Sequence, residues 1–180
     1  MTAIPLEAQI GDLLKNRQMK LTFAESCTGG LVGHRVTNIP GSSEYYLGSV
    51  TAYAYEVKEQ LLGVKHETLM TYGAVSRECV LEMARGVRSA LSGGFPLEYV
   101  LGLSISGIAG PGGATHDKPV GTVWVGMSAV DGEWAWRLQW KGDRIQNKED
   151  SAQAALQLVV NYLQGNLPPL DWHGETLLNR

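Results

Sequence analysis

The sequence has few of the residues that build disulfide frameworks or metal sites. Its 180 residues include two cysteines, Cys27 and Cys79, which form no Cys-x-x-Cys pair and show no zinc-type spacing. The four histidines are scattered, and none lies at a metal-site spacing from another. We therefore expect reduced thiols, no metal and no cofactor.

Long apolar runs and an excess of one charge are also absent. No run approaches the roughly 20 residues that span a membrane, and the N-terminus lacks the layout of a signal peptide. The 15 basic and 18 acidic residues give a formal net charge of −3, which argues against a broad basic surface for nucleic acid. These absences predict a cytoplasmic protein with neither a membrane nor a nucleic-acid partner. They leave room for a local pocket that binds one phosphate.

Helix and strand patterns alternate over the first two-thirds of the chain. Helices are expected at residues 5–16, 30–37, 57–62, 66–72, 76–91 and 144–163, and strands at residues 21–24, 45–55, 99–105, 120–130 and 134–140. A turn at Asp131-Gly132 joins the last two strands as a hairpin. The pattern predicts an α/β fold, a three-layer helix–sheet–helix sandwich with a mostly parallel sheet and an antiparallel hairpin. Residues 1–165 are expected to form a single domain, and residues 166–180 a loosely ordered tail.

The most informative segment is Ala24–Gly30, which places Ser26, Cys27, Thr28 and two glycines between an expected strand and an expected helix. Backbone N–H groups at a helix start can receive an anion or a developing oxyanion. A serine held there can attack a carbonyl carbon when a base lies nearby. Ser26 or Thr28 can also simply cap the helix, and residue chemistry alone favours capping.

Two other residues bear on the nucleophile. Lys58 is a candidate base because it opens a helix after the strand that contains Tyr53, where the helix macrodipole disfavours a cation. Taken alone, Lys58 is better interpreted as a solvated surface lysine. Cys27 is a competing nucleophile, since a thiol at a helix N-terminus has a lowered pKa. It can equally be a small side chain buried beneath the loop.

In open α/β sheets, sites collect at the carboxyl ends of strands. The loops after Ala24, Tyr53 and Ile105 are all expected there. The glycine-rich loop of residues 106–119 allows close approach of the backbone to a ligand, and Ser106 at its start is its best candidate for substrate contact. Residues 112–114 are better interpreted as a mobile connector.

Two features near the C-terminus have competing interpretations. Arg144 can bind a phosphate in a bidentate manner, although a solvated arginine beside the helix cap Asp143 is favoured. By alternation, Trp134, Trp136 and Trp140 share one face of the hairpin. Core or subunit packing is the favoured role of that face.

Blocks in a fixed order resemble the CinA C-terminal domain family over about residues 13–163. They are Ala24–Gly30, Pro40–Ser43, Gly73–Ser76, Ser106–Pro111 and Lys118–Trp124. Stand-alone members of that family are nicotinamide mononucleotide deamidases. The resemblance implies an amidase that hydrolyses this nucleotide to nicotinic acid mononucleotide and ammonia, and a homodimer or larger assembly. The alternatives are a nucleotide-binding module without catalysis and a cysteine hydrolase that uses Cys27.

The resemblance also implies roles for individual residues. Ser26 is the expected nucleophile, Lys58 its base and Tyr53 a support for the pair. Contact with the substrate is expected from Cys27, Thr28, Gly29, Gly30, Ser42, Tyr55, Ser106, Gly107, Ala109, Gly110 and Arg144. One position departs from the family's common Tyr-Ser-Asn-Glu-Ala-Lys pattern, because Tyr55 replaces its polar amide. This leaves open whether Tyr53 or Tyr55 takes the polar role.

Overall fold

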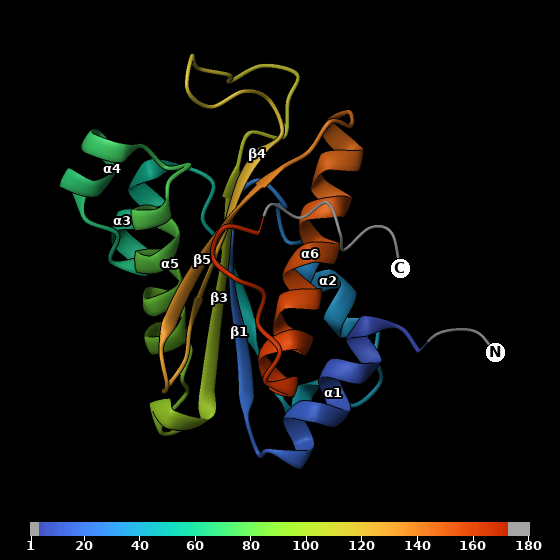
Figure 1. Ribbon diagram of the computed structural model, residues 1–180. Coiled ribbons are helices and arrows are strands. Elements are labelled where there is room, and N and C mark those ends of the chain that lie inside the picture. Colours follow the sequence, from blue (N-terminus) through green and yellow to red (C-terminus); the bar gives the residue numbers. More distant parts are fainter. Residues whose placement is uncertain (1–3, 173–180) are drawn as a thin grey trace.

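The computed structural model describes residues 4–172, and its elements follow the alternating order expected from the sequence (Figure 1). The helices are α1 (Leu6–Asn16), α2 (Leu31–Thr37), α3 (Tyr55–Leu62), α4 (His66–Tyr72), α5 (Arg77–Ala90) and α6 (Arg144–Gln164). The strands are β1 (Lys20–Glu25), β2 (Tyr46–Thr51), β3 (Val100–Gly107), β4 (Thr122–Ser128) and β5 (Glu133–Gln139). Two short 3-10 helices, η1 (Ser42–Glu44) and η2 (Leu97–Tyr99), precede β2 and β3.

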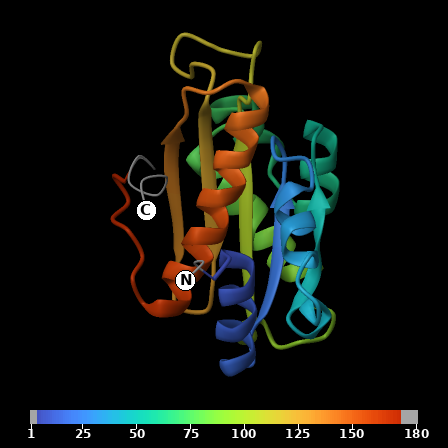
Figure 2. The same cartoon turned by 90° about the vertical axis from the view of Figure 1, so that its right-hand side faces the viewer.

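The strands form one mixed sheet in the order β2-β1-β3-β4-β5. Strand β1 is parallel to both of its neighbours, β2 and β3, whereas β4 is antiparallel to β3 and β5. Helices α1, α2 and α6 cover one face of the sheet, and α3, α4 and α5 lie on the other (Figures 1 and 2). The predicted three-layer α/β sandwich, with a parallel core and an antiparallel hairpin, is confirmed.

Trp134, Trp136 and Trp140 belong to the core between the sheet and α6. Trp136 is completely buried, and the buried Trp140 donates from its indole N–H to Ser151 Oγ on α6, at 2.9 Å. Trp134 packs against Tyr162 of the same helix, with 5.8 Å between the ring centroids. The alternation that places these tryptophans on one face therefore reflects core packing.

Several element boundaries differ from those expected, and two of them have a clear physical reason. The strand expected at residues 45–55 ends at Thr51, because its partner β1 ends at Glu25, which pairs with Thr51. Residue 55 instead begins α3. Helix α2 begins at Leu31, one residue later than expected, after Gly30 with φ +96°. Left-handed backbone of this kind suits glycine, so Gly30 ends the turn and does not belong to the helix.

The chain after α6 returns along the sheet toward β5. The Trp136 indole N–H donates to Pro168 O at 3.2 Å, and Leu167 and Trp172 pack against the core. The rest of the predicted tail, residues 173–180, lies outside the described residues. Within residues 4–172, no helix combines the length and the apolar character needed to cross a membrane.

Candidate active site

A cavity of about 390 Å³ opens at the carboxyl ends of β1, β2 and β3, where the three expected loops meet. Its volume is within the range of small-ligand sites. The cavity wall includes most of the site residues expected from the sequence. These are Ser26, Cys27, Tyr53, Tyr55, Lys58, Ser106, Gly107, Ala109, Gly110 and Arg144.

Ser26 and Lys58 form a buried pair in the wall of this cavity. The distance between Lys58 Nζ and Ser26 Oγ is 3.0 Å. Lys58 is 1% exposed and Ser26 8% exposed. Lys58 is therefore not the solvated surface lysine, and Ser26 not the helix cap, that residue chemistry favoured. The pair forms because Ser26 follows β1, Lys58 lies on α3 after β2, and the parallel strands bring both to the same edge of the sheet.

The surroundings of Lys58 suit an unprotonated amine. Burial lowers the pKa of the Lys58 amine from its ordinary value, because the charged form loses its water. Its nitrogen also lies 2.7 Å from Ala52 O and 3.2 Å from Tyr53 O, two carbonyls that accept its N–H groups. A neutral amine that donates to both carbonyls has one lone pair left, and Ser26 Oγ is the remaining neighbour. This arrangement allows Lys58 to accept the proton of the serine hydroxyl.

The two tyrosines that follow β2 lie at different sides of the cavity. The Tyr53 hydroxyl accepts a hydrogen bond from Arg144 Nη2 at 3.1 Å, and Arg144 Nη1 donates to Gly110 O at 2.6 Å. The Tyr55 hydroxyl accepts from the Ala74 N–H at 3.3 Å. Lys58 therefore contacts the main chain of Tyr53, whereas the Tyr53 side chain joins the guanidinium of Arg144 at the cavity rim.

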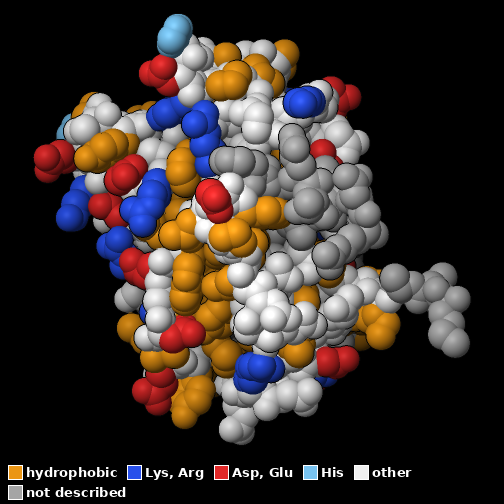
Figure 3. Space-filling view, viewed as in Figure 1, with side chains coloured by type: hydrophobic (Ala, Val, Ile, Leu, Met, Phe, Trp, Pro, Cys, Tyr) orange, Lys and Arg blue, Asp and Glu red, His pale blue; other side chains and the backbone are white. Residues whose placement is uncertain are grey.

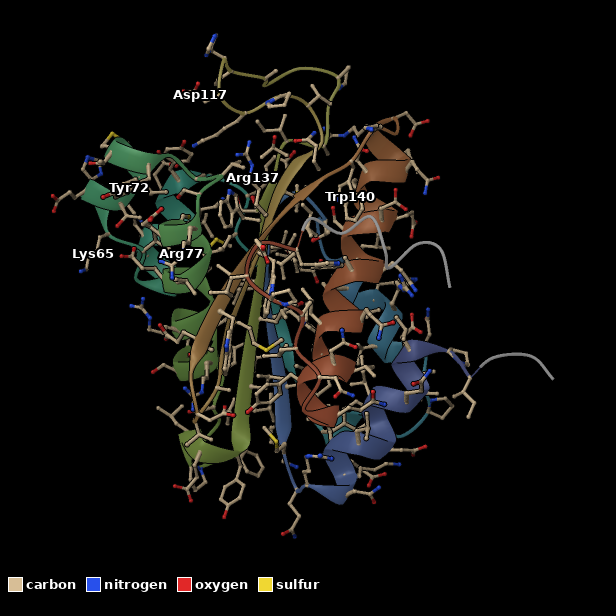
Figure 4. The ribbon with its side chains drawn as sticks, viewed as in Figure 1. Lys65, Tyr72, Arg77, Asp117, Arg137 and Trp140 are labelled. Carbon is tan, nitrogen blue, oxygen red and sulfur yellow. The ribbon has the colours of Figure 1, made fainter. Side chains whose placement is uncertain are left out.

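The glycine-rich loop after β3 is tied to α4 and β5 through two adjacent residues near its C-terminal end. Lys118 Nζ donates to Tyr72 O at 2.5 Å, and Arg137 Nη2 donates to Asp117 O at 3.1 Å. Figure 4 shows Asp117 in this loop beyond the end of the sheet, with Arg137 below it and Tyr72 to the side on α4. In the space-filling view, Lys and Arg side chains gather near α4 and α5 and up to the loop (Figure 3). The loop is thus an anchored wall of the cavity with positive charge beside it.

A carboxylate that the sequence analysis overlooked occupies the start of α2. The side chain of Glu25 accepts hydrogen bonds from the N–H groups of Gly30 at 3.0 Å, Val32 at 3.1 Å and Gly33 at 2.9 Å. Glu25 is completely buried. The amides at the start of α2 are therefore bound by the Glu25 carboxylate. This corrects the expectation that they bind a substrate anion or a capping side chain of Ser26 or Thr28. The signal available in the sequence was Glu25, an acidic residue ahead of a helix whose N-cap position, Gly30, has no side chain.

This correction narrows the set of amides that could hold an oxyanion. The N–H of Gly29 donates to Ser26 O at 3.1 Å, and that of Gly30 is bound to Glu25. Within residues 4–172, no other residue is hydrogen-bonded to the N–H of Cys27 or Thr28, and the Cys27 N–H faces its own thiol. The amide of Cys27, which lies in the cavity wall directly after Ser26, is the best placed of the four.

The remaining expected contacts with substrate lie away from the cavity. Thr28, Gly29 and Gly30 are not among the described residues that line it, and Thr28 Oγ1 is buried without a hydrogen-bond partner in the described part of the chain. Ser42 lies in η1, which precedes β2 and so sits at the amino ends of the parallel strands. The structure therefore does not bring these four residues to the cavity wall, because the turn into α2 buries Thr28 and leaves Gly29 exposed and Gly30 half-buried outside that wall.

The thiols have the opposite chemistry from that expected of a nucleophile. Burial raises the pKa of Cys27 to about 12 and the pKa of Cys79 to about 12. A helix N-terminus lowers a thiol pKa only when its amides face the sulfur, and here Glu25 occupies those amides. Cys27 is therefore a protonated, mostly buried side chain.

A larger cavity of about 800 Å³ lies between α1 and α6. Arg35 in its wall is bound to Glu7 and donates to Gln153 Oε1 at 2.7 Å. Its described wall contains no serine, cysteine or lysine that could pair as nucleophile and base. Size therefore does not identify the reactive site, and the chemistry of the wall does.

Comparisons with known sequences agree with the motif blocks. The family model for the CinA C-terminal domain matches residues 3–163. A CinA-like protein of Salinibacter ruber is 49% identical over 154 residues, which cover 86% of this chain and 36% of that protein. A CinA-like protein of Thermotoga maritima is 42% identical over 160 residues, which cover 89% of this chain and 38% of that protein. The chain spans little more than a third of the length of these curated relatives.

Solved structures of similar length share the fold. A CinA superfamily protein of Klebsiella pneumoniae superposes with a TM-score of 0.82 at 30% identity, covering 89% of this chain and 96% of that one. A competence/damage inducible protein of Agrobacterium tumefaciens gives a TM-score of 0.79 at 30% identity, covering 91% and 99% of the two chains. The names of these proteins state no reaction.

Proposed function

This chain belongs to the CinA C-terminal domain family, and from that premise we propose that it is a serine amidohydrolase. The proposed reaction converts nicotinamide mononucleotide and water into nicotinic acid mononucleotide and ammonia. The observation that carries the proposal is the 3.0 Å approach of Lys58 Nζ to Ser26 Oγ in the wall of a cavity. A hydroxyl paired with a buried amine is an activated nucleophile suited to attack on an amide.

The mechanism begins with neutral Lys58 accepting the hydroxyl proton of Ser26. The Ser26 oxygen attacks the carboxamide carbon, and the backbone N–H of Cys27 is placed to stabilise the oxyanion. Protonated Lys58 then returns the proton to the departing amine, which leaves as ammonia and gives an ester on Ser26. Water, deprotonated by Lys58, hydrolyses this ester to the carboxylate and restores the hydroxyl.

The cavity also offers positive charge for the phosphate of a mononucleotide. Arg144 lies at one side, held by Tyr53 and Gly110, and Lys118 lies at the other. A guanidinium matches the geometry of phosphate oxygens, and a lysine acts as a point charge. A phosphate bound between Arg144 and Lys118 would orient the pyridine ring toward Ser26. This supports a phosphorylated substrate over the free amide.

A substrate panel tests the proposal. Ammonia release is measured with nicotinamide mononucleotide, its dephosphorylated riboside, the dinucleotide and free nicotinamide. We expect the mononucleotide to have the highest kcat/KM by about tenfold or more, because a hydrogen bond to a charged group is worth about 1.5–3 kcal/mol. Calorimetric binding of the mononucleotide without ammonia release would favour the non-catalytic binding module. Equal turnover of the free amide would contradict the phosphate assignment.

The cysteine-hydrolase alternative makes a different prediction. We expect Cys27→Ala to retain turnover within roughly twofold, because a protonated buried thiol is a poor nucleophile at neutral pH. The measurement is the ammonia-release rate before and after treatment with iodoacetamide, with Cys79→Ala as the matched control. Loss of turnover in Cys27→Ala, with the Cys79→Ala rate unchanged, would instead assign the attack to the thiol.

A further inference from the structure

The nucleophile follows directly after a buried carboxylate that does not line the cavity. Glu25 is the last residue of β1 and is 0% exposed, and its side chain points to the first turn of α2. Its Oε2 accepts from the N–H groups of Gly30 and Val32, and its Oε1 accepts from that of Gly33. All three hydrogen bonds span the segment that contains Ser26, so both ends of this segment are joined by one side chain.

The main chain of the same residue reaches the other half of the pair. Glu25 O accepts from the Ala52 N–H at 2.8 Å, and Ala52 O in turn accepts from Lys58 Nζ at 2.7 Å. The Ser26 N–H donates to Ile105 O on β3 at 2.9 Å. Glu25 therefore lies between the strand that leads to Ser26 and the segment that holds Lys58.

The carboxylate is also the reason why the turn has its shape. Gly29 and Gly30 adopt φ of +65° and +96°, so the chain reverses within two residues before α2. Amides at a helix start need acceptors, and a turn this tight leaves no N-cap side chain to supply them. Without Glu25, the amides of Gly30, Val32 and Gly33 would lose their acceptor, and the segment would have to move to find another.

We propose that Glu25 is a positioning residue that fixes the direction of the Ser26 hydroxyl toward Lys58. This inference rests on the proposed serine–lysine chemistry and adds a residue that acts through Ser26 without touching substrate. A shift of about 1 Å between nucleophile and base can reduce a rate by about a hundredfold. Loss of the carboxylate should thus slow the chemical step more than it weakens substrate binding.

The test replaces the carboxylate with its isosteric amide. Glu25→Gln keeps the volume, but its NH2 group faces at least one backbone N–H that Glu25 now accepts. We expect kcat per folded molecule to fall about ten- to a hundredfold, with KM changed less than about threefold. In Glu25→Asp the carboxylate remains one methylene further from the amides, and a smaller loss in the same direction is expected.

The matched control removes another helix cap. Ser76 Oγ accepts from the Cys79 N–H at 3.2 Å and caps α5, so Ser76→Ala loses a cap but leaves the Ser26 segment intact. We expect Ser76→Ala to lower the melting temperature and leave kcat per folded molecule unchanged. If the Glu25 variants also lower only the melting temperature, the positioning role is overturned and Glu25 is a cap alone.

A second readout separates this inference from the proposed function. Acylation of Ser26 by p-nitrophenyl acetate, followed by mass spectrometry of the modified peptide, reports the activated hydroxyl without the nucleotide. Slower acylation of Glu25→Gln than of Ser76→Ala supports positioning, even if the wild type releases no ammonia from the mononucleotide. Equal acylation rates in the two variants would overturn positioning while ammonia release by the wild type stands.

Discussion

Ser26→Ala is expected to reduce ammonia release from nicotinamide mononucleotide by about 10³-fold or more while the fold stays intact. Loss of the nucleophile alone removes most of the catalysis in serine hydrolases, since the base has nothing to activate. The change deletes one oxygen whose hydrogen-bond partner is Lys58, so little packing is lost. The measurement is kcat by ammonia release, with the melting temperature recorded in parallel.

The matched control for this variant is Ser43→Ala. Ser43 is exposed in η1, at the opposite edge of the sheet from the cavity. We expect Ser43→Ala to keep the wild-type rate and melting temperature. Near-normal turnover in Ser26→Ala would reject the serine mechanism, and a second nucleophile in the cavity wall would then have to be sought.

Lys58→Ala is expected to lower kcat by about 10²- to 10⁴-fold, the range of general acid–base contributions. The loss should be largest above the pKa of the Lys58 amine, where the neutral amine acts as the base. Lys141→Ala is the matched control, because Lys141 is exposed and lies outside the described cavity wall. Wild-type turnover in Lys58→Ala would contradict the assignment of the base.

The wild-type pH profile tests the same residue without a mutation. Protonated Lys58 has no lone pair, so kcat should fall as the pH drops through the pKa of the buried amine, which lies below the ordinary 10.5. This acid limb should be absent from the residual rate of Lys58→Ala. A limb that persists in the variant would belong to another group.

The lowered pKa of Lys58 also has a consequence for stability. Between its native and unfolded pKa values, the unfolded chain binds more protons at this position than the native protein does. The contribution of Lys58 to the free energy of unfolding therefore rises with pH across that window. Below the native pKa, the buried ammonium is a full cost to stability. Under the proposed mechanism, the reactivity of this amine is gained at the expense of stability.

Much of the fold was predictable because local patterns and tertiary packing agree. The apolar run of β3 predicted a buried strand, and the strand is covered on both faces. Asp143 and Ser76 were expected as helix caps, and each accepts the hydrogen bond that such a cap requires. The end of β2 was missed because Tyr- and Val-rich sequence continues past Thr51, whereas the partner strand ends there.

The site was less predictable because its contacts join distant segments. Capping was the better interpretation of Ser26 from residue chemistry alone, and a surface position was the better interpretation of Lys58. Both interpretations are replaced once the parallel strands place the two side chains 3.0 Å apart. The role of Glu25 had only the signal of an acidic residue ahead of an uncapped helix, since its hydrogen bonds depend on how α2 returns toward β1.

The sequence by itself determined the α/β class, the order of the elements and the family, because these depend on periodicity, turn residues and motif blocks that are local in the chain. It also selected Ser26 and Lys58 as candidates by their residue types. Only the tertiary structure decided that the two form a pair, that Cys27 is a protonated thiol, and that the helix start is occupied by Glu25. The physical reason is that burial and distance across strands determine which groups lose water and which share a proton.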